Sequence, residues 1–192
     1  MDETHGAAEQ TQSASSLPKN YTFFGSYDHS LDPKGRIIIP TAYRKPLGEV
    51  FTISITRDGE GIALYPDPVF DELLAELYRL NQRKPAVQKY QAYLAKMSYR
   101  GMEADGQGRL LLPLKLRQMV LGDARDVEIS GALDHIRIVD RKTADDEDLF
   151  FREHREALLD EIGNKFLVNE RLTDFDTMLQ DETIDAVHLV TP

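Results

Sequence analysis

A nine-residue pattern that occurs twice constrains the fold of this chain more than any other feature. Asp32–Pro40 reads D-P-K-G-R-I-I-I-P, and Asp105–Pro113, 73 positions later, reads D-G-Q-G-R-L-L-L-P. The similarity continues beyond the motif, because Arg44 falls opposite Arg117 in the aligned copies. Self-similarity at a fixed spacing indicates a repeated structural unit. The core of the protein is therefore predicted to consist of two copies of one module.

Each motif is predicted to begin with a turn and to continue into a strand. Asp32–Gly35 places Asp, Pro and Gly where a type I turn prefers them. Ile37–Ile39 is an apolar run too short for a helix, so we expect a strand covered on both faces. Leu110–Leu112 carries the same prediction in the second copy.

Strands and helices are predicted around both motifs. Aromatic and β-prone residues from Tyr21 onward predict an opening strand. Short helices are expected over 41–48 and 113–122, each stopped by a glycine. Alternating apolar residues over 51–64 and 127–138 predict one hairpin per copy.

Three longer helices are also predicted. Asp67 is expected to cap a helix of about three turns with Pro68 at its first position. Apolar spacing over 87–97 predicts a second helix leading into the second module. Thr143 is expected to cap the last one.

These elements give an α+β chain with six parts. In chain order, the six predicted parts are a disordered tail over 1–20, a first module with its helix over 21–80, a helical linker over 81–96, a second module over 97–142, a C-terminal helix over 143–165 and an acidic tail over 166–192.

The charge distribution leaves room for a polyanionic partner despite a formal net charge of −10. Residues 21–140 contain 16 acidic and 16 basic side chains, whereas residues 141–192 contain 14 acidic and 6 basic ones. The acidity therefore lies mainly in the last fifty residues, and the repeated core can present a local basic face. No apolar run is long enough to span a membrane, and the N-terminus lacks the pattern of a secretory signal, so we expect a soluble intracellular protein.

The sequence gives little support for catalysis. It contains no cysteine, no phosphate-binding glycine loop and no metal-ligand spacing, and its five histidines are scattered singly. Asp32 and Asp105 could form a carboxylate pair, but local bonding within each turn is favoured because Asp prefers turns. We therefore expect no enzyme activity, no cofactor and no metal.

The two turns are candidate anion-binding sites. Asp32 is expected to orient Arg36, and Asp105 to orient Arg109, so that each guanidinium points outward toward phosphate or a guanine edge. Lys34 would add a phosphate contact that Gln107 cannot supply in the second copy. Lys115 completes the predicted DNA-binding set. The alternative is that the two arginines form salt bridges that only close the turns or join neighbouring subunits.

The two motifs resemble those of the MraZ family, whose signature is a pair of D-x-x-x-R modules related to the AbrB fold. The resemblance covers roughly 23–139 and includes Leu64-Tyr65-Pro66 before a helix. It implies tandem β-α-β modules of the swapped-hairpin double-psi β-barrel type. It also implies a homo-oligomeric ring, an octamer or a dodecamer, that binds promoter DNA in the cytoplasm at the nucleoid. Carried over, the DNA-contacting arginines are Arg36 and Arg109. The tails at both ends lie outside the resemblance.

Two functions from different classes follow. The first is a sequence-specific DNA-binding transcriptional regulator of the division and cell-wall gene cluster, bound to repeated promoter boxes through a homo-oligomeric ring. The alternative is a homo-oligomeric scaffold or partner-binding protein whose motif arginines form interface salt bridges. A hydrolase is a third, weakly supported hypothesis.

Overall fold

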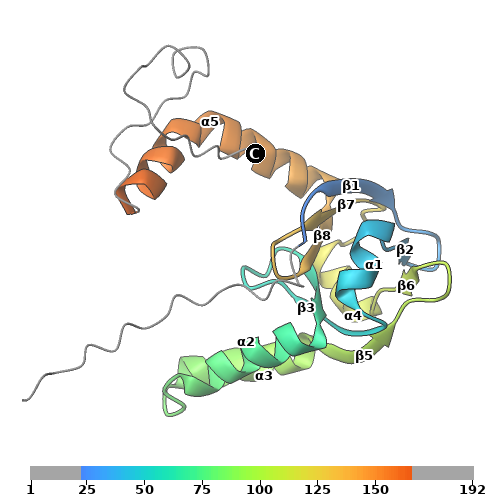
Figure 1. Ribbon diagram of the computed structural model, residues 1–192. Coiled ribbons are helices and arrows are strands. Elements are labelled where there is room, and N and C mark those ends of the chain that lie inside the picture. The colour runs from blue at the N-terminus through green and yellow to red at the C-terminus, as the bar shows by residue number, and fades with distance from the viewer. Residues whose placement is uncertain (1–22, 166–192) are drawn as a thin grey trace, which may run out of the picture. The chain divides into compact units, whose positions relative to one another are not determined.

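The structure is a computed structural model that describes residues 23–165, so the predicted tails over 1–20 and 166–192 lie outside the described residues. The described chain forms two compact units, of which the first ends at Arg141 and the second begins at Lys142. The first unit contains both motifs and all the strands (Figure 1).

The two copies have the same order of elements, a β-β-α unit followed by a hairpin. The first copy comprises β1 (Ser26–Ser30), β2 (Arg36–Ile38), α1 (Thr41–Leu47), β3 (Val50–Ile55) and β4 (Ile62–Pro66). The second comprises β5 (Tyr99–Glu103), β6 (Arg109–Leu111), α4 (Leu114–Val120), β7 (Asp126–Gly131) and β8 (Ile136–Asp140). Helices α2 (Asp67–Arg79) and α3 (Pro85–Met97) connect the copies, and α5 (Arg141–Lys165) follows the second.

The strands of the two copies are interleaved in one six-stranded sheet with the order β1-β7-β8-β4-β3-β5. Strand β1 of the first copy pairs with β7 of the second, and β5 of the second pairs with β3 of the first. The two hairpins meet where β4 pairs with β8. Each copy therefore completes the sheet of the other, and the larger of two hydrophobic core clusters takes buried side chains from both copies.

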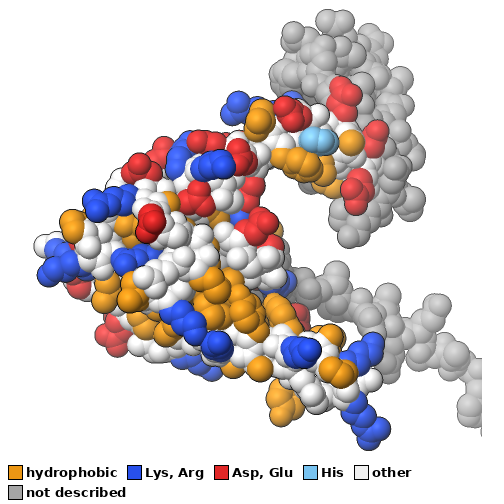
Figure 2. Space-filling model, turned by 180° about the vertical axis from the view of Figure 1, so that it is seen from behind, with side chains coloured by type: hydrophobic (Ala, Val, Ile, Leu, Met, Phe, Trp, Pro, Cys, Tyr) orange, Lys and Arg blue, Asp and Glu red, His pale blue; other side chains and the backbone are white. Residues whose placement is uncertain are grey.

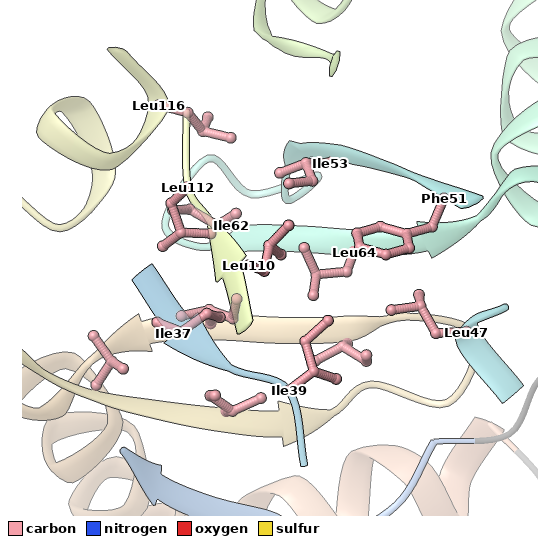
Figure 3. Close-up of a cluster of buried hydrophobic side chains, with 14 of the residues drawn as sticks. Ile37, Ile39, Leu47, Phe51, Ile53, Ile62, Leu64, Leu110, Leu112 and Leu116 are labelled. Atoms are coloured by element: carbon pink, nitrogen blue, oxygen red, sulfur yellow. The ribbon is translucent and has the colours of Figure 1, made fainter. Parts of the chain in front are cut away.

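The motif strands form a separate two-stranded antiparallel sheet, in which β2 of the first copy pairs with β6 of the second. We call this pair the motif ribbon. Its inward side chains, Ile37 and Leu110, are each 1% exposed and belong to the single large core cluster. Figure 3 shows side chains of both motifs gathered with those of β3, β4 and the short helices.

The prediction that the motif strands are covered on both faces is wrong. Ile37 and Ile39 are buried, but Ile38 between them is 46% exposed. In the second copy Leu111 is 56% exposed between two buried leucines. A two-stranded ribbon has one face on the core, and the side chains of a strand alternate between faces, so the middle aliphatic residue of each motif faces outward.

The predicted opening strand begins later than expected. Tyr21 lies outside the described residues, Phe23 makes an isolated bridge to Leu133, and β1 itself starts at Ser26 after Gly25, whose φ is +89°. The aromatic ring of Tyr43 from α1 packs edge-on against Phe23 with ring centroids 5.6 Å apart. Phe23 therefore anchors the chain on α1 before the strand begins.

Both short helices and both long connecting helices occur where they were predicted, but two caps differ. Asp67 lies inside α2, after Pro66, and its carboxylate accepts a hydrogen bond from the Thr52 hydroxyl at 2.6 Å. Thr143 lies inside α5, which begins at Arg141. Both expected caps were therefore wrong, because the chain passes directly from β4 into α2 and from β8 into α5.

None of the helices described over residues 23–165 is long and apolar enough to cross a membrane.

Replacement of Gly131 by alanine should destabilise the first unit. A Cβ at Gly131 would overlap the backbone of Phe23 and Phe24, so the anchor segment would have to move. The expected cost is about 1–3 kcal/mol of unfolding free energy, as for an overpacked site. Chemical denaturation measures it. Gly106→Ala is the matched control, because nothing lies within 4 Å of its Cβ position; equal stability of the two variants would contradict the packing described here.

Candidate nucleic-acid interface

The Asp32 carboxylate organises the first motif turn. Its Oδ1 accepts hydrogen bonds from the backbone N–H of Lys34 at 2.8 Å and of Arg36 at 2.9 Å. Its Oδ2 accepts one from Nε of Arg36 at 2.6 Å. Asp is suited to this position because its short side chain reaches backbone groups two and four residues ahead. The same carboxylate thus folds the turn and holds the guanidinium.

The second turn repeats these contacts. Oδ1 of Asp105 accepts from the backbone N–H of Gln107 and of Arg109, both at 2.9 Å, and Oδ2 accepts from Nε of Arg109 at 2.7 Å. The backbone hydrogen bond from Arg36 is the main cause of the lowered pKa of Asp32, and that from Arg109 is the main cause of the lowered pKa of Asp105. Both carboxylates are therefore held in their charged form.

The motif ribbon brings the two arginines to one outer face. Arg36 pairs with Leu111 and Ile38 pairs with Arg109, so these four side chains lie on the side opposite Ile37 and Leu110. Diagonal neighbours of this kind are about 7–8 Å apart between Cα atoms. Positions 73 residues apart in sequence thus form one surface of two guanidinium groups and two aliphatic side chains.

Both guanidinium groups keep donors available to a ligand. The Arg36 side chain is 35% exposed and that of Arg109 is 40% exposed. Each is bonded to its aspartate through Nε, and no Nη atom of either residue bonds to another described residue. The exposed Nη pair is the part of an arginine that binds phosphate or a guanine edge in a bidentate manner.

The two predicted lysines lie at different places. Lys34 is exposed in the first turn, where Gln107 occupies the equivalent position of the second. Lys115 lies on α4, outside the motif ribbon, and is also exposed. The structure therefore brings together Asp32, Arg36, Asp105 and Arg109, with Lys34 beside them, and places Lys115 on an adjacent helix.

Two further arginines contact the turns, each crossing from one copy to the other. The guanidinium of Arg44, from α1, covers Gly108 in the second turn, and that of Arg117, from α4, covers Gly35 in the first. Nε of Arg44 also donates to the carbonyl of Ile39 at 2.8 Å. A methyl group on either glycine would overlap the arginine above it. We call these two contacts the arginine clasps.

Backbone hydrogen bonds accompany the arginine clasps. The N–H of Ile39 donates to the carbonyl of Gly108 at 2.8 Å, and that of Leu112 donates to the carbonyl of Gly35 at 3.2 Å. Both glycines have φ near +80°, which is strained for other residues. The alignment of the repeats already paired Arg44 with Arg117, but it carried no information that each contacts the other copy.

The described residues offer no evident catalytic or metal site. No group of three or more His, Asp or Glu side chains within 23–165 is arranged to hold a metal ion. His135 Nδ1 lies 2.6 Å from Oδ1 of Asp134, and its ring stacks on Tyr65. This hydrogen bond is the main cause of the lowered pKa of Asp134. His135 is thus partly buried and paired, without a nucleophile beside it.

Carboxyl titrations should detect the two turn aspartates. The pKa values of Asp32 and Asp105 should lie below 3.8, the ordinary pKa of an aspartate, because backbone N–H groups donate hydrogen bonds to the charged carboxylates. A lowered folded-state pKa stabilises the fold above the unfolded value, and this contribution is lost as pH falls through the folded value. Carbon-detected NMR measures both midpoints. In Arg36→Ala, Asp32 should still titrate below 3.8, since the backbone donor remains; a midpoint at or above 3.8 in the wild-type protein would contradict this assignment.

The arginine clasps predict a coupling between positions 44 and 108. Gly108→Ala should cost about 1–3 kcal/mol from its positive φ, plus the overlap with Arg44. In an Arg44→Ala background the overlap is gone, so Gly108→Ala should cost about 1 kcal/mol less. Denaturation of the four proteins of this cycle measures the coupling. Gly101→Ala is the control: its φ is +68° with nothing within 4 Å, so Arg44→Ala should leave its cost unchanged.

Comparisons with known proteins identify the family of this chain. Residues 22–93, which include the first motif, match a family model described as "MraZ protein, putative antitoxin-like". A protein of Lachnoclostridium phytofermentans is 36% identical over 116 residues, which is 60% of this chain and 79% of the relative. One from Shewanella halifaxensis is 31% identical over 157 residues, 80% of this chain and 98% of the relative. Both relatives are named Transcriptional regulator MraZ. This chain therefore belongs to the MraZ family.

Proposed function

We propose that this chain is a sequence-specific DNA-binding transcriptional regulator and that the outer face of the motif ribbon contacts the DNA. The observation that carries the proposal is the position of Arg36 and Arg109 on one exposed face, each held at Nε by its own aspartate. The relatives bear the name of a transcriptional regulator. That name describes no enzyme, in agreement with the prediction that the chain has no enzyme activity.

The shape and chemistry of the ribbon suit the major groove. A two-stranded β-ribbon fits the width of the groove, and arginine pairs in a bidentate manner with the O6 and N7 atoms of guanine. The outward Ile38 and Leu111 offer apolar contacts to thymine methyl groups. Lys34, at the first turn, adds a phosphate contact. We assign base recognition to the ribbon, and phosphate contacts to Lys34 and Lys115.

The interleaved strands support a finer assignment of the fold. Strands β1 and β5 are exchanged between the copies, and this exchange supports the swapped-hairpin β-barrel of the AbrB type that the resemblance implies. Under this proposal the modules span 21–80 and 97–142, joined by the helical linker over 81–96. Because the motif ribbon takes one strand from each, the two modules form one binding surface.

A homo-oligomer would give this surface adequate affinity. Only Lys34 and Lys115 are assigned to phosphates in each chain, and each phosphate neutralised contributes only about −0.9 to the salt slope. Several chains on repeated boxes would raise avidity by a factor on the order of 10² or more. Exposed aliphatic side chains such as Val50 and Leu114 give neighbouring copies an apolar surface to bury. We propose a ring, an octamer or a dodecamer, acting on promoter repeats of the division and cell-wall gene cluster in the cytoplasm at the nucleoid.

The scaffold alternative uses the same arginines differently. Their unpaired Nη atoms could bind carboxylates of a neighbouring copy in place of DNA. The observation that favours DNA is that Ile38 and Leu111 share the outward face with the two arginines, because base edges in the major groove offer thymine methyl groups as well as hydrogen-bond acceptors.

Arg36→Ala and Arg109→Ala should each weaken binding of the DNA sequence that the wild-type chain enriches from a random pool. Loss of a bidentate base contact costs about 1–3 kcal/mol, while affinity for scrambled duplex should fall less. Gel-shift titration measures both affinities, and native mass spectrometry shows whether the assembly persists. Arg152→Ala, an exposed arginine of α5, is the control. Unchanged binding with intact assembly refutes the assignment, and lost assembly would support the scaffold.

A further inference from the structure

The hairpin of α2 and α3 contains a long segment without acidic residues. Residues 77–102 have none and carry six bases, in a chain whose net charge is −10. All six bases are exposed, and they are Arg79, Arg83, Lys84, Lys89, Lys96 and Arg100. Within the described residues only Arg100 has an ion-pair partner, Asp71 at 2.9 Å. Five cations on this hairpin are therefore not neutralised by the described fold.

Uncharged amides hold the hairpin together. Nε2 of Gln82 donates to the carbonyl of Leu77 at 3.0 Å, and Nε2 of Gln91 donates to the same carbonyl at 3.2 Å. Nε2 of Gln88 donates to the carbonyl of Gln82 at 2.9 Å. Since these glutamines and the buried Leu94 and Met97 make the structural contacts, the cations are not needed to keep the hairpin closed.

Three exposed side chains form a stripe along α3. Lys89, Tyr93 and Lys96 are spaced i, i+4 and i+7, which places them on one face of the helix. The Tyr93 hydroxyl lies 3.7 Å from the sulfur of Met119 on α4. Lys115 lies one turn before Met119, on the same face of α4. The stripe of α3 therefore continues onto the helix that follows the second motif.

Figure 2 shows the extent of this surface. Lys and Arg side chains recur along the lower part of the face, from the side of β2 and β6 toward the tip of the α2–α3 hairpin, with hydrophobic side chains between them. The tip of the hairpin, between the end of α2 and the start of α3, carries Arg83 and Lys84. We call the surface formed by Lys115, Lys96, Tyr93, Lys89 and this tip the basic track. Acidic residues lie on both sides of the acid-free segment in sequence, Glu72 and Glu76 before it and Glu103 and Asp105 after it.

We propose that the basic track is a second DNA-binding surface, which contacts the sugar-phosphate backbone of duplex beside the bases read by the motif ribbon. This inference rests on the proposed function and extends its phosphate contacts from Lys115 along α3 to the tip of the hairpin. Helix α3 has 13 residues and is about 20 Å long, which corresponds to about six base pairs of duplex. Lysines two turns apart on one helix face, such as Lys89 and Lys96, can each contact a phosphate of the duplex.

The test compares two variants that lose the same charge. Lys89→Ala/Lys96→Ala removes two cations of the basic track, and Arg152→Ala/Arg155→Ala removes two exposed cations of α5. Fluorescence anisotropy follows binding to two duplexes, the sequence enriched by the wild-type chain and a mixed-sequence duplex, over a range of salt concentrations. Thermal melting checks that both variants fold, and Arg83→Gln/Lys84→Gln provides an independent variant at the tip.

The expected result is an equal loss of affinity on both duplexes. Lys89→Ala/Lys96→Ala should weaken binding to each duplex by the same factor. It should also reduce the magnitude of the salt slope by about 1.8, the value for two phosphate contacts, while the α5 variant keeps the wild-type slope. The ratio of the affinity for the enriched sequence to the affinity for the mixed-sequence duplex should stay at its wild-type value. In Arg36→Ala/Arg109→Ala this ratio should fall.

Other outcomes would overturn the inference. Variants of the basic track that bind both duplexes like the α5 control would show that the track does not contact DNA. A fall in the native mass of the assembly, with DNA affinity per chain unchanged, would assign the track to an acidic segment of another copy. If the wild-type chain enriches no sequence, the proposed function fails; if it does and the track variants have no effect, only the inference fails.

Discussion

The pairing of β2 with β6 is the contact on which the rest of the structure depends. It joins three residues of one motif to three of the other, and it turns Ile37 and Leu110 into the core and Arg36 and Arg109 outward. The glycine of each turn accepts a hydrogen bond from the far end of the opposite strand, and an arginine of the opposite copy covers it. Burial of the core and presentation of the charged surface are therefore two faces of one ribbon, and neither motif can adopt this arrangement alone.

Much of the local structure could be predicted from the sequence, because turns, hairpins and helices depend on nearby residues. The turn at Asp32–Gly35 and the glycine stop at Gly48 are of this kind. The exposure of Ile38 could not be predicted, because a run of three isoleucines shows no alternation. Which of the three isoleucines points outward is decided by the pairing with the partner strand, because only one face of the resulting ribbon packs on the core.

The contacts between the two copies could not be predicted from the sequence for a related reason. The repeat shows that Arg44 and Arg117 are equivalent, but equivalence does not tell whether each contacts its own turn or the other one. The antiparallel pairing of β2 with β6 decides this, because it places the end of each motif strand beside the turn of the other copy. A single sequence does not record this long-range pairing. Likewise, the prediction that Asp67 caps a helix used a sound local preference, which the buried hydroxyl of Thr52 overrides.

The fusion of two modules in one chain also removes a symmetry constraint. A ribbon formed by two identical chains has a two-fold axis, and the DNA that it reads best is a palindrome. Here the two turns differ, with Pro33-Lys34 in one and Gly106-Gln107 in the other, and the strands contribute isoleucine on one side and leucine on the other. Because its two halves differ, this ribbon has no two-fold symmetry, and its two orientations on the duplex are not equivalent. Under the proposed function, each chain can bind an asymmetric half-turn of duplex in a single orientation, so tandem boxes that all point the same way suit a row of identical chains.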